Sequence, residues 1–369
     1  MTPPRTILIV VTRRIGDVLL ATPLIRTLRH AWPDAAIDAL VFSGTEGVLQ
    51  ANPDLRRVLT IAERPPLTAH LALAAHLWHA YDLALSLVPS DRPTVYAWLA
   101  GRTSIGLVVD APKHRWKQRL LDKWVAYDNS NTHTVNLYLR VAQALGLKPR
   151  RQVVANWNED DATRARSALA ATGVGGEYAM LHLSPKFKYK MWTLQSWQEC
   201  ARWLAERGLQ VVLTGGPDPG ERDYAAQLAR MLPSAANLVG NLSLSETAWV
   251  LSQARIYIGP DTAVTHLAAA LDVPVVTFYG PTDPVKWGPW PVHGTDDANP
   301  WRRHGTQRVG NIILLQGQAA CVPCLLEGCD RHIDSYSDCL QQLPAQRVID
   351  AAAMLLDRHS PPGRTAHAA

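Results

Sequence analysis

The sequence predicts an α/β fold of two doubly wound domains, each a parallel sheet covered by helices. Three observations lead to this prediction. Short Ile- and Val-rich runs alternate with segments of helical periodicity, an order typical of parallel sheets. A polar stretch at 148–161 interrupts that order once. The chain has 369 residues, 47% of them hydrophobic, which is enough for two buried cores at the usual domain size.

The first half opens with a predicted buried strand at 6–11. A short polar turn follows at 12–16, and then a helix at 17–31 that Pro33 ends. Further strands are predicted at 37–42, 82–87 and 103–108. We expect these elements to form one domain over residues 1–150.

The second half repeats the order after the polar segment, which is the predicted linker. Strands are predicted at 178–183, 210–213, 256–258 and 273–279, and helices at 161–172, 193–207, 220–231, 243–252 and 262–271. We expect a domain over 151–343, with a surface excursion at 287–311. The helix at 344–359 is a candidate to pack back on the first domain, and the tail 360–369 is predicted to be disordered.

The charge of the chain is modestly basic, with a formal net charge of +5. This favours an anionic partner such as a phosphate, a sugar acid or an anionic membrane surface. No module that combines basic and aromatic residues is visible, so no nucleic-acid partner is expected. The apolar run at 7–11 is too short for a secretory signal and no run approaches the ~18 residues of a membrane helix, so we expect a cytoplasmic protein.

Three segments that follow predicted strands carry chemistry. The first is the turn Arg13-Arg14-Ile15-Gly16-Asp17. Gly16 permits a tight turn, and Asp17 is expected at the start of the next helix, exposed toward a cleft. Asp17 is either a reactive carboxylate or simply the cap of that helix.

The second segment reads SPKFKYKMW over residues 184–192 and contains three lysines. These lysines either hold phosphate as point charges or form an ordinary solvated loop. The third reads GPDTAVTH over residues 259–266 and places a helix N-terminus after a strand. Such a terminus binds pyrophosphate through its amides, although a capped helix with a satisfied histidine is the alternative.

Together these segments supply a carboxylate, cations and helix amides at corresponding edges of two α/β domains, where ligands of open sheets bind. That combination suits displacement of a nucleoside diphosphate from a sugar. A base takes the acceptor proton, and cations and dipoles stabilise the leaving pyrophosphate.

The same residues carry a family resemblance. The segments ILIVVTRRIGDVLLATPLIRTLRHAWPDAAI, LHLSPKFKYKMWTLQSWQECARWL and YIGPDTAVTHLAAALDVPVVTFYGPTDPVKWGP resemble the bacterial heptosyltransferases of lipopolysaccharide core assembly, glycosyltransferase family 9. The resemblance implies the GT-B architecture, two facing doubly wound domains with the active site in a central cleft. It also implies transfer of heptose from ADP-heptose to a lipid-linked core saccharide, with inversion and without a required metal or other cofactor.

The resemblance also implies roles for individual residues. Asp17 matches the catalytic base, and Ala263 stands where many relatives have Gly. The donor-binding positions are Ser184, Lys190, Gly215, Gly216, Asp261, Thr262, Ala263 and His266. Arg13 and Arg14 match positions of acceptor or phosphate contacts.

A basic run at 113–119 lies in the half expected to hold the acceptor. It suits a phosphorylated core saccharide or an anionic membrane surface, which implies peripheral contact with the inner membrane. The alternative is a solvated helix face. The acceptor-binding candidates from this half are Lys113, Arg115 and, by its position, Arg102.

Four of the five cysteines are clustered, as Cys321, Cys324, Cys329 and Cys339. The spacing allows a structural zinc site, while reduced thiols are the alternative. No catalytic metal is expected.

Other functions remain open from the sequence. A related transferase that uses another nucleotide sugar fits the same residues. A nucleotide-sugar-binding protein without turnover has no need of Asp17, and a nucleotide-sugar epimerase has no need of the basic run.

Overall fold

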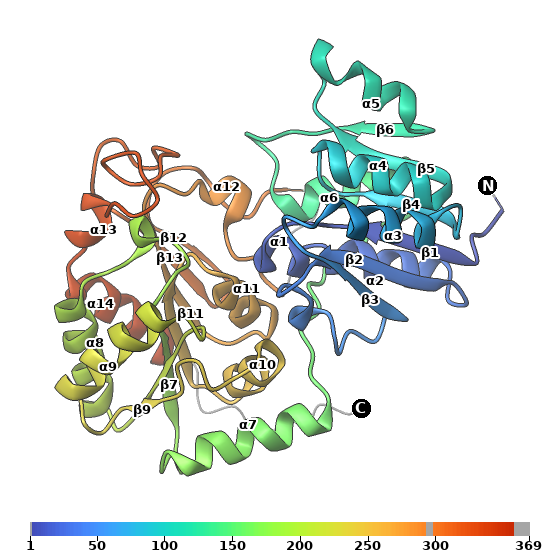
Figure 1. Cartoon of the computed structure of the whole chain (residues 1–369). Helices are drawn as coiled ribbons and strands as arrows, with labels where there is room; N and C mark the ends of the chain where they lie inside the picture. Colours follow the sequence, from blue (N-terminus) through green and yellow to red (C-terminus); the bar gives the residue numbers. More distant parts are fainter. Residues whose placement is uncertain (1, 293–297, 358–369) are drawn as a thin grey trace. The chain divides into compact units, whose positions relative to one another are not determined.

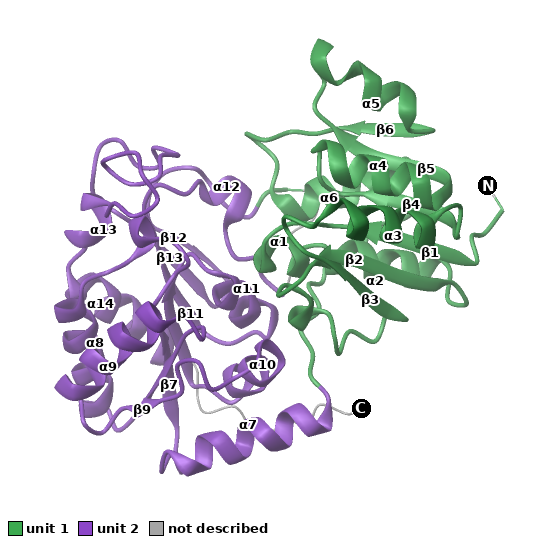
Figure 2. Ribbon diagram, viewed as in Figure 1, with its two compact units in different colours: residues 1–157, 294–299 green, residues 158–293, 300–369 purple. Residues whose placement is uncertain are grey.

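The computed structural model describes residues 2–292 and 298–357. The chain divides into two compact units, Met1–Trp157 with Gly294–Asn299 and Asn158–His293 with Pro300–Ala369 (Figure 2). Each unit contains one sheet of mostly parallel strands with helices packed against it (Figure 1). This is the α/β architecture that the alternating pattern predicts.

The sheet of the first unit has six parallel strands in the order β3-β2-β1-β4-β5-β6. The central strand β1 is buried on both faces, with Leu8 and Val10 toward one layer of helices and Ile7 and Ile9 toward the other. The strands are β1 Thr6–Val10, β2 Ala36–Phe42, β3 Arg57–Ile61, β4 Tyr81–Ser86, β5 Gly101–Val108 and β6 Lys123–Ala126.

The helix predicted at 17–31 is two helices in the structure. Pro23 lies in the first turn of the second one, where a missing amide costs no hydrogen bond. The helices of this unit are α1 Ile15–Leu19, α2 Thr22–Ala31, α3 Leu67–Leu77, α4 Asp91–Ala100, α5 Arg115–Leu120 and α6 Thr134–Ala144, with short 3-10 turns η1 Glu46–Val48 and η2 Pro112–His114.

The sheet of the second unit has seven strands in the order β12-β13-β11-β10-β7-β8-β9. All neighbours are parallel except β12 and β13. The strands are β7 Tyr178–His182, β8 Gln210–Thr214, β9 Ala236–Asn237, β10 Ile256–Pro260, β11 Val275–Tyr279, β12 Gln307–Val309 and β13 Ile312–Gln316.

Local capping sets where the helices of this unit begin. Thr193 caps α8, and Ser243 forms a capping box with Glu246 at α10. Gly208, with φ +80°, lies just after α8 in the left-handed region that ends helices. The helices are α7 Glu159–Ala171, α8 Leu194–Glu206, α9 Pro219–Met231, α10 Leu244–Ser252, α11 Ala263–Ala270, α12 Pro284–Trp287, α13 Asp338–Gln341 and α14 Ala345–Leu356, with the 3-10 turn η3 Lys188–Lys190.

The last helix, α14, packs on the sheet of its own unit, the second, whereas the sequence offered it as a candidate to pack on the first domain. Val348 and Leu355 are buried in the same core cluster as Val276 and Phe278 of that sheet. The apolar stripe of α14 shows in the sequence, but the surface that it covers does not. The predicted disordered tail 360–369 lies outside the described residues.

The predicted surface excursion at 287–311 also differs from the expectation. Trp290 and Trp301 are almost fully buried, and β12 lies at its end. The Trp301 indole donates to the Pro289 carbonyl at 3.0 Å, which anchors this segment. Residues 293–297 lie outside the described part. Within the described residues, no helix has the length and apolar character needed to span a bilayer.

Candidate active site

The predicted donor residues of the second unit meet at one edge of its sheet. Strands β10, β7 and β8 are parallel neighbours, so their carboxyl ends lie side by side. Asp261 directly follows β10, the buried Ser184 follows β7, and Gly215 follows β8. Residues up to 77 positions apart are therefore brought together by sheet topology.

Lys190 and Asp261 form an ion pair at this edge. Asp261 is buried, and the side chain of Thr282 also favours its ionised form. Burial alone raises the pKa of Asp261, but the charge and hydrogen bond of Lys190 outweigh it and lower that pKa. An ionised carboxylate repels phosphate. Asp261 is therefore suited to orient Lys190 or to accept a hydrogen bond from a sugar hydroxyl.

The helix α11 begins beside this pair. Thr262 is its cap, and the Thr262 hydroxyl accepts from the amide of Thr265 at 3.4 Å. Ala263 is the first helical residue and is half-buried. The amides of this first turn are donors suited to an anionic ligand.

His266 lies one turn into α11 and is buried. Its Nδ1 atom has no hydrogen-bond partner among the described residues. Burial lowers the pKa of His266 to about 4, so the ring is neutral at pH 7. A neutral imidazole next to Asp261 can exchange hydrogen bonds with a ligand hydroxyl without adding charge.

The Gly215-Gly216 turn, which was expected to contact the donor, makes a hydrogen bond within the protein. The amide of Gly216 donates to the Glu221 carboxylate at 2.6 Å, so it does not point at an open ligand position. Burial raises the pKa of Glu221, and the Gly216 hydrogen bond opposes that rise. Sequence reasoning missed Glu221, although an acidic residue in the first turn of the helix after a Gly-Gly-Pro turn was a usable signal.

The first unit places Asp17 in α1, directly after β1. Arg14 is the N-cap of α1, so Asp17 is not the cap that the alternative interpretation required. Asp17 is 6% exposed, which corrects the expectation of an open carboxylate. Its Oδ1 lies 3.7 Å from Nε of Arg13. Burial lowers the pKa of Arg13, but the Asp17 charge more than compensates, and that pKa rises above its usual value.

The other acceptor candidates separate into two groups. Lys113 in η2 and Arg115 at the start of α5 are exposed and follow β5 at its carboxyl end. Arg102 is the second residue of β5 and therefore lies at the amino end of the parallel sheet, opposite the edge of Asp17. Arg102 does not join the other candidates, because position along a strand decides which edge a side chain occupies.

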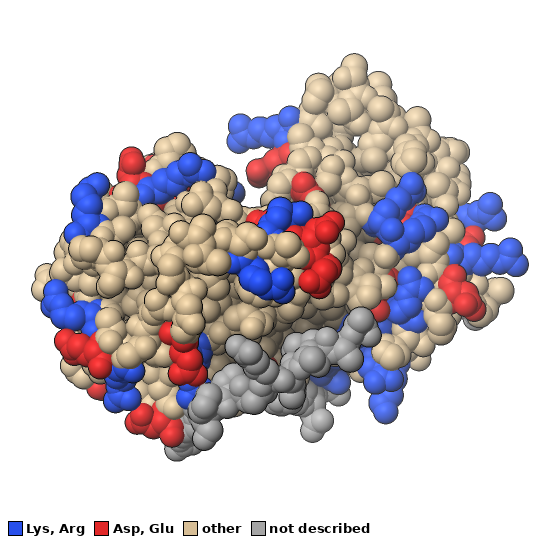
Figure 3. All heavy atoms as spheres, turned by 90° about the horizontal axis from the view of Figure 1, so that it is seen from below, with Lys and Arg blue, Asp and Glu red and all other residues tan. Residues whose placement is uncertain are grey.

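The basic run is also less uniform than its sequence suggests. Lys117 is 1% exposed and donates to the Pro89 carbonyl at 2.5 Å, with Asp91 at 2.6 Å. This lysine anchors α5 and is not a surface charge. On the face seen in Figure 3, Lys and Arg are interspersed with Asp and Glu, as the modest net charge implies.

The clustered cysteines are free thiols in the structure. Cys321 and Cys329 are exposed, Cys324 is half-buried and Cys339 is buried. Burial raises the pKa of Cys339 to about 12. Within residues 2–292 and 298–357, no group of three or more His, Cys, Asp or Glu is arranged to hold a metal ion.

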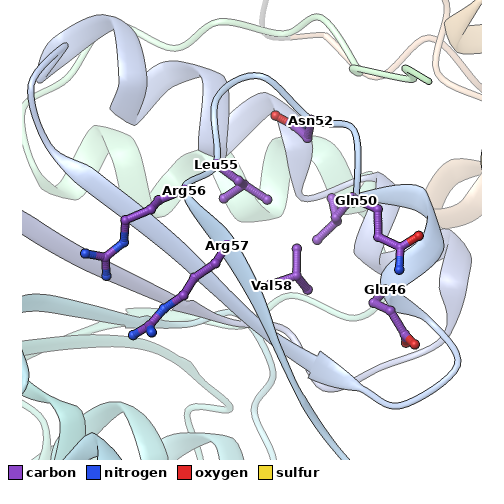
Figure 4. Close-up of a pocket in the computed structure, with 8 residues that line it drawn as sticks. Glu46, Gln50, Asn52, Leu55, Arg56, Arg57 and Val58 are labelled. Atoms are coloured by element: carbon purple, nitrogen blue, oxygen red, sulfur yellow. The ribbon is translucent and has the colours of Figure 1, made fainter. Parts of the chain in front are cut away.

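A small pocket beside the edge strand β3 lies apart from these residues (Figure 4). Its volume is about 170 Å³, and Arg56 and Arg57 point away from Glu46 and Gln50. Both arginines bind the buried Asp38. The pocket is lined by Glu46, Leu49, Gln50, Asn52, Leu55, Arg56, Arg57 and Val58, none of which belongs to the predicted site.

The comparison with protein families decides the class. Residues 71–299, more than half of the chain, match glycosyltransferase family 9 (heptosyltransferase). The chain belongs to glycosyltransferase family 9. It is therefore a glycosyltransferase, as the resemblance of its motifs predicts.

Two lipopolysaccharide heptosyltransferases match this chain over nearly its whole length. Lipopolysaccharide heptosyltransferase 3 of Escherichia coli K12 is 29% identical over 94% of this chain and 96% of its own length. Lipopolysaccharide heptosyltransferase 1 of Pseudomonas aeruginosa is 29% identical over 95% of this chain and 98% of its own length.

Solved structures agree on the fold. The family 9 glycosyl transferase from Veillonella parvula has a TM-score of 0.78 at 18% identity, covering 96% of this chain and 98% of that one. The E. coli heptosyltransferase WaaC with ADP has a TM-score of 0.70 at 23% identity, and the match covers 95% of this chain and 99% of that one. The likeness shows that this family 9 member has the predicted GT-B fold.

Proposed function

We propose that this chain is an inverting heptosyltransferase that moves heptose from ADP-heptose onto the lipopolysaccharide core oligosaccharide. Family membership supports the reaction class, and the names of the curated relatives support the sugar and the acceptor. The observation that carries the proposal is the joint placement of Lys190, Asp261 and His266 where the parallel strands β7 and β10 end.

The donor belongs, in this proposal, to the domain over residues 151–343. Lys190 and the first amides of α11 bind the diphosphate, because both offer donors to an anion. Asp261 holds the Lys190 ammonium in place. Neutral His266 and the hydroxyl of Ser184 contact the donor without adding charge.

The acceptor belongs to the domain over residues 1–150. Asp17 takes the proton of the acceptor hydroxyl as the acceptor oxygen forms its bond to C1 of the heptose. The bond between C1 and the phosphate oxygen breaks, and its electron pair leaves with ADP. Attack from the face opposite the leaving group inverts C1. Lys190 and the helix amides stabilise the charge on ADP, so the proposal includes no required metal or other cofactor.

The acceptor is lipid-linked in this proposal, so the reaction takes place at a membrane surface. The exposed cations Lys113 and Arg115, together with Arg13 and Arg14, supply contacts for acidic groups on the acceptor. We propose that the protein is cytoplasmic and that Lys113 and Arg115 also allow peripheral contact with the anionic inner-membrane surface.

Calorimetric titration with ADP, UDP and GDP tests the donor assignment. We expect the wild type to bind ADP in preference to UDP and GDP. ADP binding should be weakened in Lys190→Ala and unchanged in Lys186→Ala, which removes an exposed lysine of the same loop. Preference for UDP or GDP would replace the donor within the same class. Binding of ADP without transfer to core acceptors would favour a nucleotide-sugar-binding protein. Conversion of the donor sugar without any acceptor product would favour an epimerase.

A further inference from the structure

The helices α3, α4 and α5 of the first unit carry exposed apolar side chains. Helix α3 packs against α4, and α4 packs against α5 (Figure 1). Leu77 of α3 and Tyr96 of α4 pack toward the sheet, in the core cluster that contains Leu8 and Val10. We define the α3–α5 surface as the large apolar residues that remain outside, Leu67 (71% exposed), Leu71 (61%), Trp78 (61%), Trp98 (41%) and Trp116 (42%).

Helix α3 is apolar on two faces. Its sequence, LTAHLALAAHL, contains no Lys, Arg, Asp or Glu. Leu67, Leu71 and Trp78 are spaced four and seven residues apart, which places them on one stripe of the helix, away from the buried Leu77. A surface helix of a globular protein normally carries charged and polar residues on the face opposite the core. The stripe therefore fits an apolar partner.

Tryptophan gives this surface the chemistry of a membrane interface. Among the described residues, the tryptophans that are exposed are Trp78, Trp98 and Trp116, and all three lie on the α3–α5 surface. The amide of His79 donates to the Leu99 carbonyl at 2.9 Å, which brings the backbone of Trp78 beside that of Trp98. An indole combines an apolar ring with a polar N–H, so it is stable at the boundary between acyl chains and headgroups.

Cations border the same surface. Lys113, Arg115 and Arg119 are exposed on both sides of Trp116 in the sequence. No Asp or Glu occurs at 111–121. Exposed Lys and Arg beside an apolar surface attract anionic headgroups. A second copy of the chain on the same surface would bring like charges together, so charge favours an anionic bilayer over self-association.

We propose that the α3–α5 surface docks this chain on an anionic phospholipid bilayer, with its Trp and Leu side chains inserted at the level of the headgroups. This adds an apolar anchor to the contact through Lys113 and Arg115. The choice of a membrane as partner rests on the proposed function, because a lipid-linked acceptor lies in one. Helix α3 follows β3, so Leu67 lies toward the carboxyl edge of the sheet, where Asp17 also lies. Docking through α3 therefore keeps the acceptor edge close to the lipid.

Cosedimentation of the full chain with vesicles of phosphatidylethanolamine and phosphatidylglycerol tests the surface. The wild type should bind, and Leu71→Gln/Trp78→Gln should bind about tenfold more weakly, because two apolar side chains no longer leave water. The matched control is Met231→Gln/Met354→Gln, which changes two exposed residues on helices of the second unit and should bind like the wild type. Equal binding by the wild type and Leu71→Gln/Trp78→Gln would overturn the proposal, and so would an equal loss in the control.

Trp78→Leu gives a second readout. This variant keeps an apolar side chain, so vesicle binding should persist, while quenching of tryptophan fluorescence by lipids with brominated acyl chains should fall. Unchanged quenching would place the Trp78 indole outside the lipid and overturn its insertion. Light scattering tests the other occupant. A wild-type dimer that becomes a monomer in Leu71→Gln/Trp78→Gln, without vesicle binding by the wild type, would assign the surface to a second copy of this chain.

Transfer assays separate this proposal from the proposed function. Leu71→Gln/Trp78→Gln should act like the wild type on a water-soluble, deacylated acceptor and more slowly on the acceptor in vesicles. Equal rates on the vesicle acceptor would contradict docking through this surface. Absence of transfer by the wild type to either acceptor would instead reject the proposed function, and vesicle binding, which is measured without turnover, would still decide the docking surface.

Discussion

Lys190 forms an ion pair with Asp261 in the second unit, although the two residues are 71 positions apart in the chain. The pair joins the loop after β7 to the start of α11. It places a cation at the helix end where amides already favour an anion. Asp261 neutralises much of that charge until a diphosphate arrives, so the pair is a preformed but balanced element of the proposed donor site.

Replacing Lys190 by Ala should weaken ADP binding by roughly 1.5–3 kcal/mol, the value of a charge-assisted hydrogen bond. The loss also leaves Asp261 buried without its cation, which adds repulsion toward phosphate. Calorimetry measures the effect. Lys188→Ala is the control, because Lys188 is exposed in the same turn. Equal affinity of the wild type and Lys190→Ala would remove this residue from the donor site.

Asp17→Asn should abolish transfer while leaving ADP affinity within about twofold of wild type. The amide has nearly the shape of the carboxylate but cannot accept the acceptor proton as a base. Transfer is followed with purified core acceptor, and binding by calorimetry. Normal transfer by this variant would contradict the assignment of Asp17 as base, and loss of ADP binding would point to a structural role.

His182 should make the protein less stable to heat as the pH falls from about 6.5 to about 4. It is buried at the end of β7, and burial lowers its pKa to about 4. In the unfolded chain this histidine is protonated below about pH 6.5, whereas in the folded chain it is protonated only below about pH 4. Its contribution to the free energy of unfolding is therefore fully present above pH 6.5 and is lost as the pH falls from 6.5 to 4. The loss is on the order of 3 kcal/mol at pH 4.

The measurement is the thermal midpoint as a function of pH, compared between wild type and His182→Gln. We expect a flatter profile in the variant, with a residual slope from His266, which has the same shift. His332→Gln is the control, since His332 is exposed. A slope that survives unchanged in His182→Gln would contradict the assignment.

Asp38→Ala should destabilise the first unit by about 3–5 kcal/mol. Asp38 is fully buried in β2 and accepts hydrogen bonds from Arg56, Arg57 and Tyr81. Burial raises its pKa, but these donors outweigh burial and lower it, so the ionised carboxylate is the stable form. Urea unfolding gives the change. Asp34→Ala, at an exposed position before the same strand, should change little.

The local pattern of the chain determined much of the fold. Ile- and Val-rich runs marked β1 and β11, and polar caps such as Ser243 marked helix starts, because side-chain burial and capping act over a few residues. The motifs around Asp17 and Asp261 indicated the family. Pro23, although visible, did not predict the break between α1 and α2, since a proline is tolerated both at a helix start and at a kink.

Only the tertiary structure decided how these pieces meet. It placed Asp261, Ser184 and Gly215 at one edge of the second sheet. In the first sheet, Arg102 lies at the amino end of β5, at the edge opposite to Asp17. The helix α14 packs in the core of the second unit. The tertiary structure also paired the Gly216 amide with the Glu221 carboxylate. Strand order, burial and the partners of buried polar groups depend on contacts between residues far apart in the chain, and propensity and spacing report only on neighbours.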